Sequence, residues 1–374
     1  MRQGFHSVRF RAIRRAMTGP RYPDLIAALP QTVPFVGPEV QERAMNRRFV
    51  ARLGANESVF GPSPFAVAAM QEEAGEIWKY ADPSSHDLKA ALAAGLGCAP
   101  DNIVLGEGID GLLGNCVRLL TAPGDAIVTS DGAYPTFAYH AAGFGAALHR
   151  VPYRDDAEDI DALVARATEV DAKLVYLSNP DNPMGSWHDG RRIDRMLDAL
   201  PDGTVLALDE AYIEFAPDGT APAIDPEDPR VIRFRTFSKG YGMAGARVGY
   251  AVGARAFIGA FDKVRNHFAM NRVAQVGTLA AYQDTEWLEE VVRLTAEARE
   301  RIAAIARDAG LVPLPSATNF VAVDCGADGT FARAVLDGLI ARGIFVRMPA
   351  VAPLNRCIRI GAGRAEDLDA LSPL

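Results

Sequence analysis

Five short apolar runs, separated by helical stretches, constrain the fold more than any other feature of this chain. The runs are NIVLG, AIVTS, KLVYLS, TVLALDE and VIRFRTF, and they lie between residues 102 and 237. Each is continuously apolar rather than alternating, which is typical of parallel strands covered on both faces. Helical patterns lie between most of them, as in GRRIDRMLDAL at 190–200. The sequence therefore predicts an α/β protein with a mostly parallel central sheet.

The pattern changes after about residue 255, which indicates a second domain. A long charged helix is predicted over 286–310, and it leads into strands at NFVAVD and CIRIGA. A chain of 374 residues is long enough for two sizeable cores. We predict an N-terminal arm and part of the small domain at 1–52, a large domain at 53–258 and a small α+β domain at 259–374.

Charge and composition exclude several classes of function. The net charge of −8 disfavours nucleic acid or an anionic membrane as the main partner. The longest apolar runs are far shorter than a membrane span. The four scattered cysteines form no C-x-x-C, which predicts reduced thiols in a cytoplasmic protein. The six histidines show no ligand spacing, so we expect no metal site.

The first 17 residues, MRQGFHSVRFRAIRRAM, are basic and lack the continuous apolar core of a secretion signal. We favour a flexible arm, with a transit peptide as the alternative. Met17 is a second candidate initiator, so whether residues 1–16 are made in the cell stays open.

Residues 240–245, GYGMAG, match the G-x-G-x-x-G pattern of dinucleotide-binding proteins. That pattern requires a full helix and then a parallel strand that ends in an acid. Here the next strand-like run, ARVGYAVG, begins at about residue 246 and ends without an acid. Because a parallel crossover needs about a dozen residues or more, we predict an antiparallel return. A dinucleotide site is therefore disfavoured.

Lys239, directly before these glycines, is the candidate nucleophile. A lysine that follows a strand and is partly desolvated has a lowered pKa, which suits a Schiff-base lysine. Asp209 ends the buried run TVLALD, at the edge where open α/β sheets bind ligands. An ionised acid there needs a cation, such as a protonated pyridine nitrogen. Taken alone, Lys239 could be a surface lysine and Asp209 a helix cap.

Further polar residues follow the same strands. Tyr212 lies three residues after Asp209, and Asn182 in LSNPDNPMG could donate its amide to a phenolate oxygen, with a plain Asn-Pro turn as the alternative. Arg247 could pair with a phosphate. The segment Gly108-Ile109-Asp110 stands between a strand and a helix, where backbone N–H groups bind phosphate.

Together these motifs resemble those of the fold-type I pyridoxal-phosphate (PLP) aminotransferases, and most of all those of the histidinol-phosphate aminotransferases. The motifs that carry the resemblance, from about residue 53 to residue 364, are ANES, YADPSSHDLKAALA, GID, AYPTF, NPDNPMG, LDEAYIEF, RTFSKGYGMAGARVGY and CIRIGAG. The combination of DEAYIEF with SK and AGAR is specific. The resemblance implies the fold of this family, with a mostly parallel sheet, one antiparallel strand and a smaller α+β domain, and PLP as the cofactor.

The resemblance also implies roles for individual residues. Lys239 would bind PLP covalently and then move a proton between the substrate Cα and cofactor C4′. Asp209 would keep the pyridine nitrogen protonated, so that the ring acts as an electron sink. Asn182 and Tyr212 would hydrogen-bond the ring oxygen, and Tyr134 would stack on the ring. The residues implied for the cofactor phosphate are Gly108, Ile109, Asp110, Thr236, Ser238 and Arg247.

Other matches bear on the substrate and on assembly. Arg359 matches the arginine that grips the acidic end of the substrate, and Arg347 matches a second arginine used on a substrate phosphate. Asn56 and Phe35 are further candidates for substrate contact. Tyr80 matches a tyrosine that reaches across a dimer interface to the partner's cofactor phosphate and substrate. The resemblance therefore implies a homodimer with shared active sites.

One departure leaves the amino donor open. Family members often carry a tyrosine in an N-terminal PY segment, where this chain has Phe35 in TVPFVGPE, so a hydroxyl for the substrate phosphate is missing. The leading hypothesis is transfer of the amino group from histidinol phosphate to 2-oxoglutarate, giving imidazole-acetol phosphate and glutamate in histidine biosynthesis. The alternative is an aromatic amino-acid aminotransferase. A PLP-dependent phospho-amino-acid decarboxylase is less favoured, because LGANES replaces an HGG-like stretch.

Overall fold

The computed structural model describes residues 19–31, 35–223 and 225–372. Contacts divide the chain into two compact units, Met1–Thr32 and Val33–Leu374. The first unit contains helix α1 (Asp24–Ala28). The basic segment 1–17 lies outside the described residues, so its prediction is untested.

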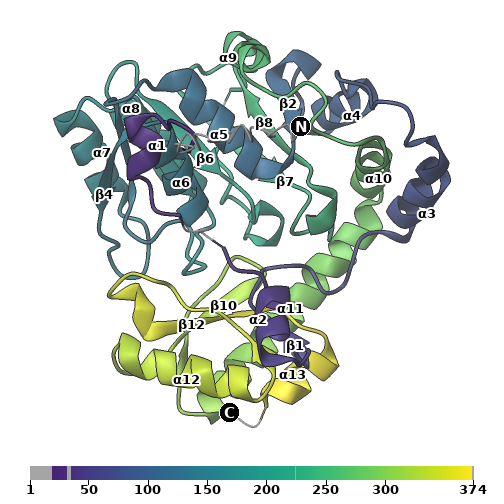
Figure 1. The fold of residues 1–374 in the computed structure, drawn as a ribbon, viewed down its shortest axis with the longest axis vertical. Helices are drawn as coiled ribbons and strands as arrows, with labels where there is room; N and C mark the ends of the chain where they lie inside the picture. The colour runs from purple at the N-terminus through teal and green to yellow at the C-terminus, as the bar shows by residue number, and fades with distance from the viewer. Residues whose placement is uncertain (1–18, 32–34, 224, 373–374) are drawn as a thin grey trace, which may run out of the picture. The chain divides into compact units, whose positions relative to one another are not determined.

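Seven strands of the second unit form the central sheet, in the order β2-β8-β7-β6-β5-β3-β4 (Figure 1). Their bounds are β2 (Ile103–Gly106), β3 (Ala126–Ser130), β4 (Ala147–Val151), β5 (Leu174–Ser178), β6 (Val205–Asp209), β7 (Val231–Thr236) and β8 (Gly249–Gly253). β8 pairs antiparallel with both β7 and β2, whereas the remaining pairs are parallel. The predicted mostly parallel sheet with a reversed strand after Lys239 is confirmed.

Strand β4, at one edge of this sheet, was not among the strands predicted from the sequence. Its residues are only partly buried except Val151. Its sequence, ALHRV, contains His149 and Arg150 and therefore lacks the apolar run that marked the predicted strands.

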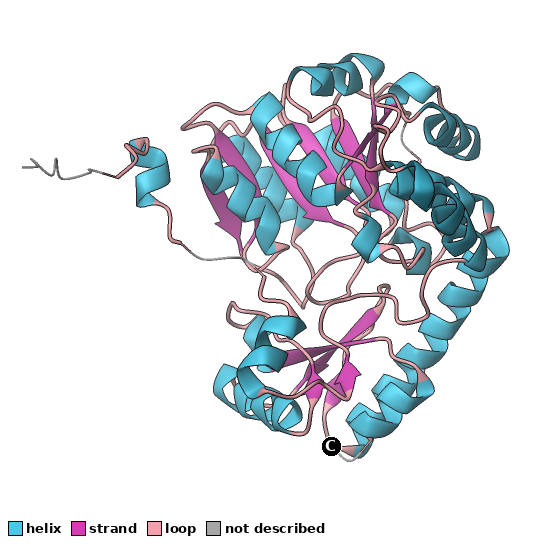
Figure 2. Cartoon of the chain, turned by 45° about the vertical axis from the view of Figure 1, so that its right-hand side comes forward, coloured by secondary structure: helices cyan, strands magenta, loops and turns pink. Residues whose placement is uncertain are grey.

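Helices lie on both sides of the central sheet (Figure 2). Their bounds are α3 (Pro64–Glu73), α4 (His86–Leu96), α5 (Gly108–Leu120), α6 (Pro135–Gly143), α7 (Ile160–Glu169), α8 (Gly190–Ala199), α9 (Arg255–Ala260) and α10 (Arg272–Gln283). Successive strand residues point to opposite faces. Tyr176 therefore joins the core beneath α5 and α6, whereas Val175 and Leu177 join the core beneath α7 and α8.

Short 3-10 helices complete the connections between these elements. They are η1 (Ala74–Glu76), η2 (Pro100–Asn102), η3 (Ile213–Phe215), η4 (Ala244–Ala246), η5 (Phe261–Lys263) and η6 (Leu354–Arg356). No helix among the described residues is long and apolar enough to cross a membrane.

A smaller α+β region follows helix α11 (Thr285–Asp308). Its antiparallel sheet has the order β12-β10-β9, and its elements are β9 (Val312–Pro313), β10 (Phe320–Asp324), α12 (Gly329–Ala341), β11 (Ile344–Phe345), β12 (Cys357–Gly361) and α13 (Ala365–Leu371). From the N-terminal side, α2 (Pro38–Met45) precedes β1 (Ala51–Arg52), which pairs parallel with β11 (Figure 1). The domain boundaries at 52 and 258 stay a prediction, because Val33–Leu374 forms one compact unit.

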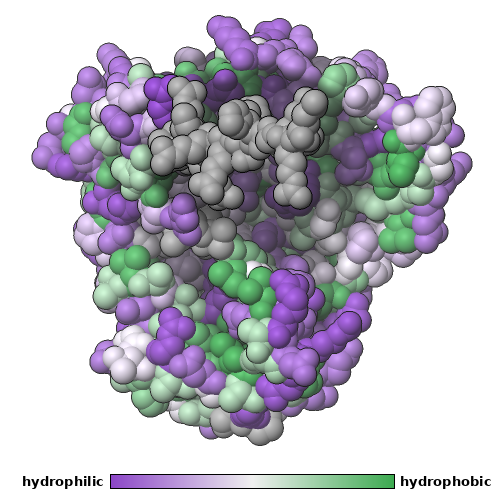
Figure 3. All heavy atoms as spheres, viewed as in Figure 1, coloured by the Kyte–Doolittle hydropathy of each residue, from purple (hydrophilic) through white to green (hydrophobic). Residues whose placement is uncertain are grey.

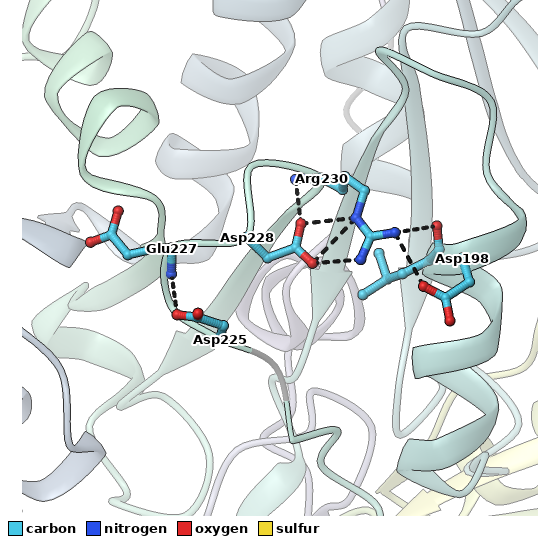
Figure 4. Close-up of polar contacts among 6 residues, drawn as sticks. Asp198, Asp225, Glu227, Asp228 and Arg230 are labelled. Atoms are coloured by element: carbon cyan, nitrogen blue, oxygen red, sulfur yellow. Dashed lines mark hydrogen bonds and ion pairs between the residues drawn. The ribbon is translucent and has the colours of Figure 1, made fainter.

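An exposed ion-pair group precedes β7. Arg230 pairs with Asp228, at 2.8 Å between Nη2 and Oδ2, and with Asp198 of α8, at 3.2 Å between Nη1 and Oδ1 (Figure 4). Because water screens such half-exposed pairs, each contributes roughly 0–1 kcal/mol to stability.

A buried ion-pair group stands at the other end of β6 and β7. Glu210, directly after β6, is 1% exposed and accepts from Arg233 (Nη2–Oε1 2.8 Å) and Arg235 (Nε–Oε2 2.9 Å). The two arginines are two residues apart on β7 and therefore share a face. Burial alone would raise the pKa of Glu210, but the positive charges of Arg235 and Arg233 bring it below its usual value. The network ties the end of β6 to β7.

We predict that Glu210→Ala destabilises the fold by about 3–5 kcal/mol, because it removes the buried carboxylate that accepts hydrogen bonds from both guanidinium groups. The matched control, Asp198→Ala, removes an exposed partner and should cost less than about 1 kcal/mol. Urea denaturation of both variants measures the free energies of unfolding. Equal losses in the two variants would contradict the assignment of Glu210 as a buried anchor.

Candidate active site

The candidate site lies at the carboxyl ends of β5, β6 and β7, three neighbouring strands of the central sheet. Asp209 is the last residue of β6, and Lys239 follows the end of β7 by three residues. Open α/β sheets bind ligands outside these ends of their strands. The strand order therefore brings the two predicted residues to the same edge.

Asp209 is a buried carboxylate, 4% exposed, with hydrogen bonds but no cation. Its Oδ2 accepts from the Tyr176 hydroxyl at 2.7 Å, and its Oδ1 accepts from the Ala211 N–H at 3.0 Å. Burial raises the pKa of Asp209 to about 6, although both hydrogen bonds lower it. Within the described part of the chain, no Lys, Arg or His pairs with this acid.

Lys239 is held by the loop that follows β1. Its Nζ donates to the carbonyl oxygen of Asn56 at 3.0 Å and lies 5.6 Å from the centre of the Tyr212 ring. Burial, and secondly the positive charge of Arg359, lower the pKa of Lys239 to about 8. A neutral, nucleophilic amine is therefore accessible near neutral pH.

Asn56 connects Lys239 to Tyr212. The Asn56 amide donates to the Tyr212 hydroxyl at 2.8 Å, and its backbone has a φ of 55°, a left-handed conformation that asparagine tolerates. Its carbonyl accepts a second hydrogen bond from Asn319, at 3.1 Å. Burial raises the pKa of Tyr212 to about 12, so the hydroxyl keeps its proton.

The predicted phosphate-binding residues meet at the start of α5. Arg247 donates to the Ser238 hydroxyl at 3.4 Å, and the Ser238 N–H donates to Thr236 Oγ1 at 3.1 Å. The Arg247 guanidinium and β8 both lie close to the start of α5. A Cβ on Gly108 would lie 2.4 Å from Arg247 Nη2, and a Cβ on Gly249 of β8 would lie 2.8 Å from the backbone N of Ile109. A helix N-terminus beside a guanidinium that has no carboxylate partner in the described residues can bind an anion.

Tyr134 and Asp110 form a further contact at this end of the site. Tyr134 immediately precedes α6, and its hydroxyl donates to Asp110 Oδ1 at 2.8 Å. Asp110 lies in the first turn of α5, next to Ile109. The structure thus brings both residues to the predicted phosphate end, while stacking by Tyr134 on a cofactor ring stays a prediction.

Two arginines lie side by side on the small sheet. Arg347 and Arg359 pair through their backbones, with Arg347 N donating to Arg359 O at 3.3 Å. Arg359 also donates to the Asn182 side-chain oxygen, and its guanidinium lies 5.1 Å from the Phe320 ring. Burial, and then the positive charge of Arg359, lower the pKa of Arg347 to about 10.

Phe35 and Val36, which precede α2, contact Arg347. The Arg347 guanidinium lies 3.9 Å from the Phe35 ring centre and donates to the Val36 carbonyl. The Nε atoms of Arg347 and Arg359 are buried without a hydrogen-bond partner, and neither arginine pairs with a carboxylate among the described residues. Two unneutralised cations of this kind predict a site for a ligand with more than one negative charge.

Tyr80 is the predicted site residue that the structure leaves apart from this cluster. It is 80% exposed, and its ring lies 4.8 Å from that of Phe268. The contacts described for Tyr80 involve no other predicted site residue. In a single chain it is a surface residue, so its predicted role depends on a partner.

Two residues of the site were not predicted from the sequence. Tyr176 donates a hydrogen bond to Asp209, and Asn319 donates one to the Asn56 carbonyl. Tyr176 is the tyrosine in the buried run LVYLS. A buried tyrosine hydroxyl usually needs a hydrogen-bond partner, so its position in this run could have indicated a nearby polar group. Nothing in the local sequence marked Asn319. No group of His, Cys, Asp or Glu among the described residues is arranged to hold a metal ion.

Comparison with known proteins assigns the chain to a family. Residues 49–372 match the family model described as aminotransferase class I and II. A histidinol-phosphate aminotransferase of Jannaschia sp. (strain CCS1) is 36% identical over 84% of this chain and 88% of its own. A histidinol-phosphate aminotransferase of Roseiflexus castenholzii is 36% identical over 95% of this chain and 97% of its own length.

A solved structure adds to this comparison. The histidinol-phosphate aminotransferase from Sinorhizobium meliloti, crystallised in complex with pyridoxal-5'-phosphate, is 53% identical, with a TM-score of 0.92 over 96% of this chain and 97% of that one. Because family model, relatives and structure all match over most of the chain, it belongs to the aminotransferase class I and II family.

Proposed function

We propose that this aminotransferase uses PLP to transfer the amino group of histidinol phosphate to 2-oxoglutarate, a step of histidine biosynthesis. The proposal rests mainly on a buried carboxylate, Asp209, and a partly buried amine, Lys239, which lie at the ends of neighbouring strands and are not ion-paired within the described residues. The names of the relatives and the PLP in the Sinorhizobium meliloti structure support it.

The residues of the site fit PLP. A protonated ring nitrogen is the cation that Asp209 lacks. Ser238, Arg247 and the N–H groups at the start of α5 would hold the phosphate. The room for that group depends on Gly108, where a Cβ would strike the Arg247 guanidinium.

When bound, PLP supplies an electron sink that stabilises negative charge at the substrate Cα. Lys239 Nζ, whose pKa is lowered to about 8, would accept the proton from the substrate Cα and deliver it to cofactor C4′. The Asn56 carbonyl orients that amine. Because the Tyr212 hydroxyl accepts from the Asn56 amide, its own proton stays available for the ring oxygen.

Arg347 and Arg359 favour a phosphate-bearing donor. A phosphate group carries close to two negative charges and can take bidentate hydrogen bonds from guanidinium groups. An aromatic amino acid, with a single carboxylate, would leave one arginine without a counter-ion. The alternative, an aromatic amino-acid aminotransferase, is favoured by Phe35, whose half-exposed ring lies against Arg347 and carries no hydroxyl.

We further propose a homodimer with shared active sites. Ile77, Trp78 and Tyr80 are 70%, 77% and 80% exposed, and Phe268, which contacts Tyr80, is 51% exposed. We call Trp78, Tyr80 and Phe268 the exposed aromatic patch, which Ile77 directly precedes in the sequence. The space-filling view shows apolar surface over α3, the helix that precedes Ile77 and Trp78 in the chain (Figure 3). An exposed apolar patch of this kind is typical of an interface.

A cytoplasmic location is part of the same proposal, and four free cysteines support it.

The substrate assignment predicts a selective effect of Arg347→Gln. Loss of a charged hydrogen bond to the phosphate should lower kcat/KM for histidinol phosphate by about 10- to 100-fold. With phenylalanine as donor, the change should stay within about threefold, because no phosphate is bound. Steady-state kinetics with both donors measure the ratio, and the exposed Arg333→Gln serves as control. An equal loss with both donors would argue for a structural role of Arg347.

The assembly proposal predicts that Trp78→Glu combined with Phe268→Glu yields monomers, because each charge would have to be buried in the interface. Sedimentation velocity should show a dimer for the unmodified chain. Tyr139→Glu, at an exposed tyrosine outside the exposed aromatic patch, should leave that dimer intact. A monomeric unmodified chain would refute the shared-site assembly.

A further inference from the structure

We propose that Tyr176 is a positioning residue for the cofactor site: its hydroxyl holds the Asp209 carboxylate in the orientation and charge state that a protonated ring nitrogen requires. The inference rests on the proposed function, because it concerns how this chain receives PLP. It assigns a task to a buried residue that the mechanism above does not use.

The strand register places Tyr176 within reach of Asp209. β5 and β6 run parallel, with Tyr176 opposite Ala207 and Ser178 opposite Asp209. Residues two apart on a strand share a face, so the side chains of Tyr176 and Asp209 lie on the same side of the sheet. The long tyrosine side chain extends toward the carboxyl end of the strands and donates to Oδ2 at 2.7 Å.

The ring of Tyr176 is fixed by stacking. Phe137 of α6 lies against it, with 4.3 Å between ring centres and an angle of 15° between the planes. Tyr176 is 0% exposed and Phe137 is 1% exposed, so neither ring has room to turn away. The hydroxyl is thereby held at Asp209, while the Ala211 N–H occupies the other oxygen. An ionised carboxylate has about four acceptor sites, so capacity remains for a ring N–H.

The charges around Asp209 explain why the hydrogen bond from Tyr176 is important for the protonation state of this carboxylate. Burial raises the pKa of Asp209, and so do the negative charges of Asp110 and Glu210, whereas Tyr176 and the Ala211 N–H lower it. The main titratable groups that interact with Asp209 among the described residues include Tyr176, Asp110, Glu158, Glu210 and Tyr212. None of these is a cation. Without the Tyr176 hydroxyl, the carboxyl would hold its own proton to higher pH and be neutral where PLP needs an anion.

The effect on PLP affinity has a defined pH dependence. Where Asp209 is protonated in the PLP-free protein, binding must ionise it, and the Tyr176 hydrogen bond favours that ionisation. Where Asp209 is already ionised, the hydrogen bond is present before and after binding, and its effect on affinity cancels. The hydroxyl therefore strengthens binding at and below the pKa of about 6 and not well above it.

The test is Tyr176→Phe, which keeps the stacked ring and removes the hydroxyl. The full-length chain is freed of PLP, and its affinity for PLP is measured by fluorescence titration across this pH range. We expect affinity to fall about tenfold near pH 6 and less than about twofold near pH 9. In the PLP-loaded variant, kcat should fall while KM for histidinol phosphate stays within about twofold.

Tyr250→Phe, at another buried tyrosine of the central sheet, is the matched control and should leave PLP affinity unchanged. If Tyr176→Phe does not fold, Phe137→Leu loosens the stacked ring and should give a smaller loss with the same pH dependence. A loss that is independent of pH, or no loss, would overturn the role of Tyr176. An unmodified chain that does not bind PLP would overturn the proposed function as well.

Discussion

Burial of the Asp209 carboxylate without a counter-charge is the constraint on which the rest of the site depends. Its chain neighbour, Glu210, is equally buried but accepts hydrogen bonds from two arginines, so the fold provides for that charge internally. Asp209 receives only neutral donors. A buried ion that lacks a partner is costly. In an aminotransferase the bound cofactor is best suited to supply the positive charge that Asp209 lacks. The stability of the carboxyl end of β6 and the affinity for the cofactor are therefore linked.

The residues proposed to hold the substrate belong to a different sheet from those proposed to hold the cofactor. Arg359 and Arg347 lie on and beside β12, whereas Asp209 and Lys239 follow strands of the central sheet. Hydrogen bonds connect the two sets: Arg359 donates to Asn182, and Asn319 donates to the same Asn56 carbonyl that accepts from Lys239. Two separate hydrogen-bonded links therefore join the elements proposed to hold the substrate to those proposed to hold the cofactor.

The sequence predicted those features that depend on local pattern. Five strands were recognisable because they are mostly apolar. The reversal of β8 followed from a connection that is too short for a parallel crossover. The positions of Lys239, Asp209 and Asn182 at strand ends followed from the same strands. The Tyr176–Asp209 hydrogen bond and the Phe35–Arg347 contact were not predictable, because they depend on register and packing between segments far apart in the chain. The edge strand β4 was missed because it is half-exposed.

Lys239 is the amine that we propose receives the cofactor. The most direct measurement is to reduce the PLP-loaded protein with borohydride, digest it and locate the pyridoxyl group by mass spectrometry. We predict modification of Lys239 alone, because its pKa is lowered to about 8 and its amine is held at Asn56. Stoichiometric modification of Lys79, Lys89, Lys173 or Lys263 instead, or an unmodified Lys239 in a PLP-loaded sample, would contradict the account.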